Sequence, residues 1–218
     1  MKLRQHSNRE EFLEKNLKEI ALGARVLDFC CGTGMNGITA LQYGAAYVTF
    51  TDVRQQTFTN WIENSNYGYD TSAVTDNNHT WKYVDADNIE ELPNQVDLHN
   101  LDIIIYHGHF YHARNHNSII KILSDSSAKH FIFETKGSGD LNTTCHWHLE
   151  ETEDKWNTWV GDERLTAPVG SPSWGLSKML FEYHGWKIKD VLQQKWKHYG
   201  ENSEFSPILD QTRVYFNR

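Results

Sequence analysis

Residues 25–36 read RVLDFCCGTGMN. The apolar run from Val26 to Phe29 predicts a buried strand, and the small residues that follow it predict a tight loop. Ile38 and Leu41 then fall on one face of a predicted helix. A strand, a glycine turn and a helix in this order form half of a nucleotide-binding βαβ unit, in which the helix N-terminus offers free backbone N–H groups. This stretch therefore predicts a ligand site at the end of the strand.

The loop resembles the first motif of class I S-adenosylmethionine-dependent methyltransferases, which reads acidic-x-Gly-x-Gly-x-Gly. Asp28, Gly32 and Gly34 match this motif, and Cys30 stands where its first glycine usually lies. Cysteine is small, so we expect the loop to tolerate it. The resemblance implies S-adenosylmethionine as the cofactor, with S-adenosylhomocysteine as its product.

Carboxylates also follow two later predicted strands, at the sheet edge where open α/β sheets bind ligands. Asp52 follows the strand predicted over residues 47–51, where an acidic side chain can accept hydrogen bonds from both hydroxyls of a ribose. Asp85 follows the strand predicted over residues 81–84. The resemblance implies that Asp85 contacts the adenine amino group and that the Ala86 backbone N–H contacts a ring nitrogen. The residues expected to bind the cofactor are Asp28, Cys30, Gly32, Thr33, Gly34, Asn36, Asp52, Val53, Asp85, Ala86, Tyr106 and His107.

Other interpretations of the same residues remain open. Asp52 also suits the N-cap of a helix predicted over residues 54–67, and Asp85 suits an ordinary loop. NAD is the main alternative ligand, because an acid about 20 residues beyond the glycine loop also suits an NAD ribose. No lysine follows Gly34, which argues against a phosphate-binding P-loop.

Strands alternate with helices over the first part of the chain, which predicts a doubly wound α/β sheet. We expect a single domain over residues 1–218, with a mostly parallel seven-stranded sheet and an antiparallel strand at its C-terminal end, as the resemblance also implies. Residues 138–174 are rich in tryptophan and lack clear periodicity, which predicts an insertion or lid. The expected helices cover residues 8–22, 35–43, 54–67, 119–123 and 173–184. The expected strands cover residues 25–30, 47–51, 81–84, 101–106, 130–134, 186–192 and 213–216.

The turn after the predicted central strand reads GHFYH over residues 108–112. It resembles a methyltransferase subgroup with a G-x-L-Y-H turn, which includes small-molecule enzymes and tRNA wobble-uridine enzymes. Methyl transfer mainly requires alignment, with a base only where the acceptor must lose a proton. The candidate catalytic residues are His107, His112 and Glu134. The candidate substrate-binding residues are Tyr111, His112, His146 and Trp174. His112 also suits a packing role, and Glu134 also suits a hydrogen bond to the loop backbone.

The composition and the absence of two motifs limit the class of methyl acceptor. The formal net charge of −8 lacks the basic footprint of a nucleic-acid enzyme, and the chain has neither an Asn/Asp-Pro-Pro-Tyr turn nor a Pro-Cys nucleophile. We therefore expect methyl transfer to an O or N atom of a small molecule. The alternatives are an RNA methyltransferase of the wobble-uridine type and a non-catalytic S-adenosylmethionine-binding protein.

Location and metal content are predicted from simpler features. The chain has three cysteines and no apolar segment of membrane-spanning length, so we expect a cytoplasmic protein without a membrane partner. Histidines are dense over residues 107–116 and 146–148, but a strand-end loop would not hold them on one face. We therefore expect no metal site. The oligomeric state is not indicated by the sequence.

Overall fold

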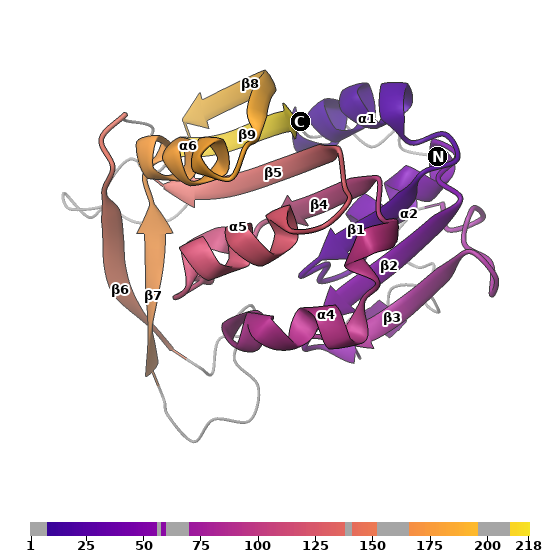
Figure 1. Cartoon of the computed structure of the whole chain (residues 1–218), viewed down its shortest axis with the longest axis horizontal. Coiled ribbons are helices and arrows are strands. Elements are labelled where there is room, and N and C mark those ends of the chain that lie inside the picture. The colour runs from indigo at the N-terminus through magenta and orange to yellow at the C-terminus, as the bar shows by residue number, and fades with distance from the viewer. Residues whose placement is uncertain (1–7, 56–57, 60–69, 138–140, 152–165, 196–209) are drawn as a thin grey trace, which may run out of the picture.

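A computed structural model of the chain describes residues 8–55, 58–59, 70–137, 141–151, 166–195 and 210–218. Its centre is a seven-stranded sheet with the order β3-β2-β1-β4-β5-β9-β8 (Figure 1). The first five strands run parallel, and β9 is antiparallel to both β5 and β8. The predicted doubly wound sheet with an antiparallel strand at its C-terminal end is confirmed. The strands are β1 (Arg25–Phe29), β2 (Tyr47–Asp52), β3 (His79–Tyr83), β4 (Ile103–His107), β5 (His130–Gly137), β8 (Lys187–Lys195) and β9 (Asp210–Asn217).

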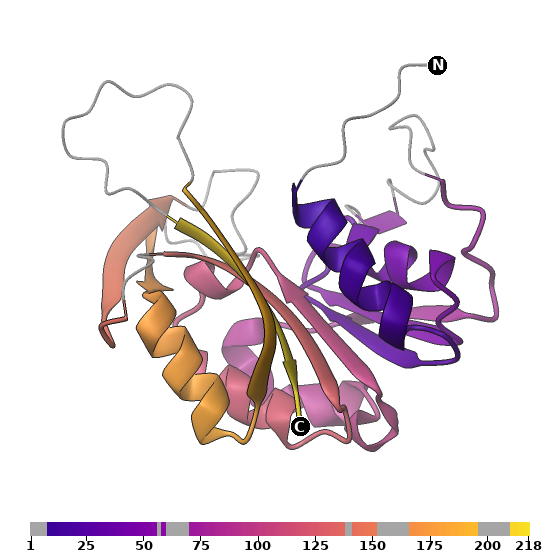
Figure 2. The same cartoon turned by 90° about the horizontal axis from the view of Figure 1, so that it is seen from above.

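Helices cover both faces of the sheet (Figure 2). Helices α1 (Asn8–Ile20) and α2 (Met35–Gln42) lie on one face, and α4 (Leu92–Gln95), α5 (His116–Ser124) and α6 (Trp174–Tyr183) lie on the other. Successive side chains of a strand point to opposite faces, so Val26 packs with α1 and α2 while Leu27 packs with the α5 and α6 side. This double coverage explains why β1 and β4 read as continuous apolar runs. Most of the helix predicted over residues 54–67 lies outside the described residues.

The segment after β5 corrects one expectation. The sequence predicts an insertion or lid without clear periodicity over residues 138–174, but β6 (Cys145–Glu151) and β7 (Thr166–Pro172) form a separate antiparallel two-stranded sheet there. Pro168, Gly170 and Pro172 lie in β7 and hide its alternating pattern. Proline is tolerated there because each strand of a two-stranded sheet is an edge strand. Part of the predicted insertion, residues 152–165, lies outside the described residues.

The sheet order places a ligand site at a definite position. Neighbouring strands β1 and β4 continue the chain in opposite directions along the sheet, and ligands of open α/β sheets bind outside the carboxyl ends of the strands at such a reversal. Two short 3-10 helices follow strands at this edge, namely η2 (Ala86–Glu91) after β3 and η4 (Phe110–His112) after β4. A third, η3 (Leu98–Asn100), precedes β4 and so lies at the opposite edge. None of the described helices has the length and apolar character needed to cross a membrane.

Candidate functional site

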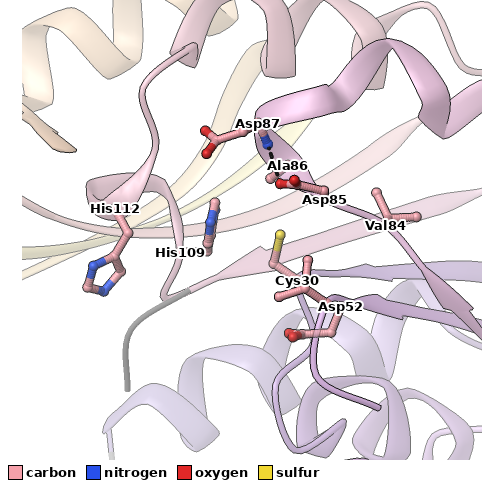
Figure 3. A pocket seen from close by; sticks show the side chains of 9 residues that line it. Cys30, Asp52, Val84, Asp85, Ala86, Asp87, His109 and His112 are labelled. Atoms are coloured by element: carbon pink, nitrogen blue, oxygen red, sulfur yellow. Dashed lines mark hydrogen bonds between the residues drawn. The ribbon is translucent and has the colours of Figure 1, made fainter. Parts of the chain in front are cut away.

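A crevice lies at the carboxyl ends of strands β1 to β4 (Figure 3). It holds about 340 Å³ of space, counting open solvent at its mouth. The sequence predicted most of the residues in its wall, but it missed Val84, Asp87 and His109. The residues that line it are Cys30, Asp52, Val53, Val84, Asp85, Ala86, Asp87, His109 and His112.

Asp28 near the end of β1 holds the glycine loop in place through a hydrogen bond to the start of α2. This carboxylate is fully buried, and its Oδ2 accepts a hydrogen bond of 2.8 Å from the backbone N–H of Gly37 in the first turn of α2. Gly34 caps α2 with a φ of 79°, and a Cβ there would lie 2.7 Å from the ring of Phe58. The loop therefore requires glycine at this position for both its backbone angle and its packing. Asp28 supports the loop and does not line the crevice.

Cys30 occupies a backbone conformation that usually belongs to glycine. Its φ of 54° lies in the left-handed region, which costs a residue with a Cβ on the order of 1–2 kcal/mol. Its side chain lines the crevice between Asp52 and His109 (Figure 3). Burial, followed by the negative charge of Asp52, raises the pKa of the Cys30 thiol, so the sulfur is protonated and neutral near neutral pH.

Asp52 ends β2 and is almost completely buried in the crevice wall. Its Oδ2 accepts a hydrogen bond of 2.8 Å from the Gly32 backbone N–H. Its Oδ1 accepts from the Arg54 backbone N–H at 2.9 Å and from the Arg54 Nε at 3.2 Å. A carboxylate offers about four lone-pair positions, so these three bonds leave one position for a ligand. Asp52 thus binds the backbone two residues ahead, while most of the helix for which an N-cap role was considered lies outside the described residues.

The turn after β3 is organised by its own side chains. Asp85 is the N-cap of η2, and its Oδ1 accepts a hydrogen bond of 2.9 Å from the Asp87 backbone N–H (Figure 3). Asp87 pairs with the Arg114 guanidinium at 2.7 Å, while burial raises the pKa of the Asp87 carboxyl above its usual value. Asn115 donates from its amide to the carbonyl of Ala86 at 3.1 Å. These contacts tie the β3 turn to the segment that follows β4.

The β4 turn contributes two histidines, one of which the sequence did not indicate as a site residue. His109 is 9% exposed, and its Nδ1 lies 2.8 Å from the hydroxyl of Tyr106. Burial, with smaller effects from His112 and Arg54, lowers the pKa of His109 to about 3. His112 is half-buried at the same turn, with its ring centroid 6.4 Å from that of His109. His109 is the variable position of the G-x-L-Y-H turn, so the motif gives no signal for it.

Several predicted site residues lie away from the crevice. Tyr106 is fully buried and reaches the crevice only through His109. His107 is buried at the end of β4 beside Glu134, and neither residue is part of the crevice wall. Thr33 and Asn36 lie in the loop and the first turn of α2, half-buried and outside the crevice wall.

Glu134 lies in a buried ion pair. Its Oε2 is 2.7 Å from the Nε of Arg213 on β9, and both side chains are less than 5% exposed. The Glu134 carboxylate thus bonds across two neighbouring strands that are far apart in the sequence, and its backbone carbonyl accepts a hydrogen bond of 3.4 Å from the Gly108 N–H. This position gives Glu134 a structural partner instead of an open path to a substrate.

The three remaining candidates for substrate binding are also placed outside the crevice. The ring of Tyr111 packs on His112 with centroids 4.1 Å apart and lies under the Lys136 ammonium at 4.9 Å. His146 is exposed on β6. Trp174 is the first residue of α6 and belongs to the hydrophobic core, because Ser173 caps that helix and fixes the direction of its first turn. Trp174 is therefore a core residue in this fold.

The two-stranded sheet is attached directly to the β4 turn. The Gly170 backbone N–H on β7 donates to the Ala113 carbonyl at 3.0 Å. The Nε2 of His116 lies 2.9 Å from the Gly170 carbonyl and 3.0 Å from the Phe110 carbonyl. A Cβ at Gly170 would lie 2.7 Å from the sulfur of Cys145, so the close approach requires glycine. The insertion thus supports the turn that carries His109 and His112.

No protein-family model and no curated protein matches the chain by sequence. Solved structures do match it by fold. The N-terminal domain of EvdMO1, crystallised in the presence of S-adenosylhomocysteine and D-fucose, matches with a TM-score of 0.67 and 11% identity over 98% of this chain and 84% of that one. The fold is that of the class I methyltransferases.

Two further structures with this fold are described as methyltransferases, and the description of one of them names RNA. An S-adenosylmethionine-dependent methyltransferase from Mesorhizobium loti matches with a TM-score of 0.64 and 13% identity, over 97% of this chain and 98% of that one. A candidate RNA methyltransferase from Pyrococcus horikoshii matches with a TM-score of 0.55 and 13% identity, over 99% of this chain and 85% of that one. At this level of identity the likeness defines the fold and leaves the acceptor open.

The topology also separates this fold from the dinucleotide-binding one. Gly32, Gly34 and Gly37 satisfy the spacing G-x-G-x-x-G, so the glycines alone are equally suited to NAD. The antiparallel strand β9 between β5 and β8 is the feature that the methyltransferase fold has and the parallel dinucleotide sheet lacks.

Proposed function

We propose that this protein is an S-adenosylmethionine-dependent methyltransferase that acts on an O or N atom of a small molecule. One observation carries the proposal: Asp52 at the end of β2 and Asp85 after β3 line one crevice together with Cys30 of the glycine loop. The fold supports it, since a structure with a similar fold, the N-terminal domain of EvdMO1, was crystallised with S-adenosylhomocysteine bound. We infer that the cofactor's nucleoside lies between Asp52 and Asp85, with its methionine end along the loop.

The charges of the crevice suit a cationic cofactor. S-adenosylmethionine supplies an electrophilic methyl group on a positively charged sulfonium. Asp52, Asp85 and Asp87 bring three carboxyl groups to the wall, opposed by Arg54 and Arg114, which pair with two of them. The remaining negative charge lies on Asp85, which is exposed at the rim. We propose that Asp52 and Asp85 accept hydrogen bonds from the ribose and the base, as the resemblance implies.

The histidine side of the crevice is the proposed acceptor side. His112 is half-buried at the edge of the crevice and is the candidate base that remains beside it, because His107 and Glu134 lie outside its wall. Histidine is the side chain that most often serves as a general base, so His112 suits the removal of a proton from an acceptor hydroxyl or amine. If the acceptor is already unprotonated, alignment alone suffices.

A small acceptor fits the charge of the chain better than RNA does. The net charge of −8 and the acidic crevice would repel a phosphate backbone. The likeness to a candidate RNA methyltransferase keeps RNA as the second hypothesis. Binding to tRNA that persists as salt is raised would favour RNA, whereas absence of binding at physiological salt would favour the small molecule.

Isothermal titration tests the cofactor, and transfer of labelled methyl groups tests the activity. We expect the full chain to bind S-adenosylmethionine and S-adenosylhomocysteine and to show no heat with NAD. Incubation with labelled methyl donor and a panel of small hydroxyl and amine compounds should then label a member of the panel. Binding of NAD instead would overturn the cofactor, and binding of the methyl donor without transfer to small molecules or RNA would favour a non-catalytic binding protein.

A further inference from the structure

His109 is a polar side chain that is held rigidly and points its other nitrogen at the crevice. It is 9% exposed, and its Nδ1 is fixed by the 2.8 Å contact with the Tyr106 hydroxyl. Within the described residues, no protein atom bonds its Nε2. His109 lies between His112 and Cys30, facing the turn of Asp85, Ala86 and Asp87 (Figure 3). Because His109 lines the crevice and its Nε2 has no protein partner among the described residues, this nitrogen is available to a ligand there.

The Tyr106 hydroxyl determines which nitrogen of His109 carries the proton. Tyr106 is fully buried, and within the described chain His109 is the sole hydrogen-bond partner of its hydroxyl. If Nδ1 carried the proton, the hydroxyl hydrogen would be buried without an acceptor, which is costly. The favoured arrangement therefore has the Tyr106 O–H donating to Nδ1. The proton of a neutral imidazole then lies on Nε2, on the side of the crevice.

We propose that His109 is a fixed, neutral N–H donor that binds a ring nitrogen of the cofactor's adenine, with Tyr106 as the positioning residue that sets its tautomer. This inference rests on the proposed function. An adenine presents its amino group as a donor and its ring nitrogens as acceptors. Asp85 is suited to the amino group, and the Ala86 backbone N–H is suited to one ring nitrogen, so a further ring nitrogen, N3 or N7, remains for His109.

The absence of charge on His109 makes it suitable for a site that binds a positively charged cofactor. A protonated imidazole in the crevice would repel the positive sulfonium of the methyl donor, whereas a neutral one donates a hydrogen bond without a charge. Val53 and Val84 line the same crevice and provide apolar surface for a planar base. A carboxylate or phosphate ligand would gain little from a neutral donor and would meet Asp85 and Asp87.

Nitrogen NMR of histidine-labelled protein tests the tautomer without any ligand. We expect the Nε2 of His109 to carry the proton and Nδ1 to lack one. Tyr106→Phe keeps the aromatic packing on Phe29, whose ring centroid is 4.9 Å away, but removes the O–H. We expect this variant to show a mixture of tautomers. A wild-type His109 with its proton on Nδ1 would overturn the proposal.

Deaza analogues of S-adenosylhomocysteine test the ligand atom, because they replace one ring nitrogen by C–H. We expect the wild type to bind either the 3-deaza or the 7-deaza analogue about three- to tenfold more weakly than S-adenosylhomocysteine, as for loss of one hydrogen bond. His109→Phe should lose a similar factor for S-adenosylhomocysteine and no longer distinguish that analogue. His109→Gln, which retains an N–H donor, should recover part of the affinity.

The control is His99→Phe, an exposed histidine on η3 at the opposite edge of the sheet, which should bind every analogue as the wild type does. If His109→Phe and His109→Gln, both folded by circular dichroism, bind S-adenosylhomocysteine as the wild type does, His109 does not contact the adenine and the proposal is wrong. If the wild type itself binds no S-adenosylhomocysteine, the proposed function fails, and the adenine contact fails with it. The NMR result still decides the tautomer in that case.

Discussion

The two walls of the crevice carry different kinds of side chain. The wall formed by the ends of β2 and β3 carries the carboxylates Asp52, Asp85 and Asp87, whereas the wall formed by the β4 turn carries His109 and His112. Both walls are held by protein contacts that leave capacity for a ligand: one lone-pair position remains on Asp52, and one nitrogen remains on His109. The acidic wall attracts a cation, and the neutral His109 avoids repelling it.

The walls also differ in how they are supported. Asp52 is held by neighbouring backbone N–H groups and by Arg54, so its position follows from the loop itself. His109 depends on Tyr106 from within the core and on the β4 turn, against which β7 packs through Gly170. The acidic wall is therefore a local structure, and the histidine wall depends on long-range packing.

The largest effect is expected at the buried Glu134–Arg213 pair, which joins β5 to β9. Glu134→Gln should lower the free energy of unfolding by about 3–5 kcal/mol, because it leaves Arg213 buried with an uncompensated charge. Chemical denaturation measures this loss. The double variant Glu134→Gln/Arg213→Met should recover part of it. If Glu134 were instead the catalytic base, the single variant would unfold like the wild type and lose only turnover.

The next largest effect is a pH dependence of the free energy of unfolding, which is expected from His109 on the histidine wall. The pKa of His109 is about 3 in the folded protein and about 6.5 when unfolded, so the unfolded state binds the extra proton between these values. The free energy of unfolding should therefore fall as pH decreases below 6.5. At pH 5 this group alone should cost about 2 kcal/mol relative to pH 7, at about 1.4 kcal/mol per pH unit.

Comparison with His109→Phe isolates that contribution. The wild type should lose about 2 kcal/mol more than the variant between pH 7 and pH 5, since other histidines titrate equally in both. Urea denaturation at the two pH values measures the difference. Equal losses in the two proteins would mean that His109 is protonated in the folded state, contrary to the burial seen here.

The same contrast explains which site residues the sequence predicted. Asp52 and Asp85 follow strands whose patterns are local, so their meeting at one sheet edge follows from the parallel order of the strands. The fold was likewise predictable from alternating periodicity, with most helix and strand positions within a few residues of those observed. β7 escaped detection because proline and glycine interrupt its alternation, whereas β6, which reads CHWHLEE, contains neither residue.

The residues that sequence reasoning misplaced depend on distant partners. Glu134 pairs with Arg213, which lies 79 residues further along the chain, so no local pattern indicates that its carboxylate is occupied. Trp174 was expected in a lid because its segment is rich in tryptophan, but the Ser173 cap directs it into the core. His109 was missed because its role depends on its depth and on the Tyr106 hydroxyl.

On the acidic wall, Asp52→Ala should weaken the binding of S-adenosylhomocysteine by more than tenfold. The change removes the carboxylate proposed for the ribose and also frees the Gly32 N–H that orients the loop. Bonds to charged groups contribute about 1.5–3 kcal/mol, which corresponds to roughly 10- to 150-fold in affinity. Isothermal titration measures the loss, with the exposed Asp70→Ala as the matched control. An unchanged affinity would refute the ribose role of Asp52.

The smallest expected effect concerns the number of lone-pair positions on the Asp52 carboxylate that are open to a ligand. A ribose offers two hydroxyls, but the Arg54 Nε occupies a position on Oδ1 that the second hydroxyl would need. Arg54→Met removes this competitor and leaves the Arg54 backbone bond intact, so the affinity for S-adenosylhomocysteine should rise by about threefold, as for one modest hydrogen bond. Lys121→Met, which removes an exposed cation on α5, is the control.

S-adenosylhomocysteine separates this competition from the simple loss of a positive charge, because it lacks the sulfonium of the methyl donor. If Arg54 competes for Asp52, both ligands should gain by a similar factor in Arg54→Met. If Arg54 acts only through its charge, S-adenosylmethionine alone should gain, since only its sulfonium is repelled by the guanidinium. A loss of affinity for both ligands would mean that Arg54 orients Asp52 for the ribose, and the two walls would then each depend on a positioning residue.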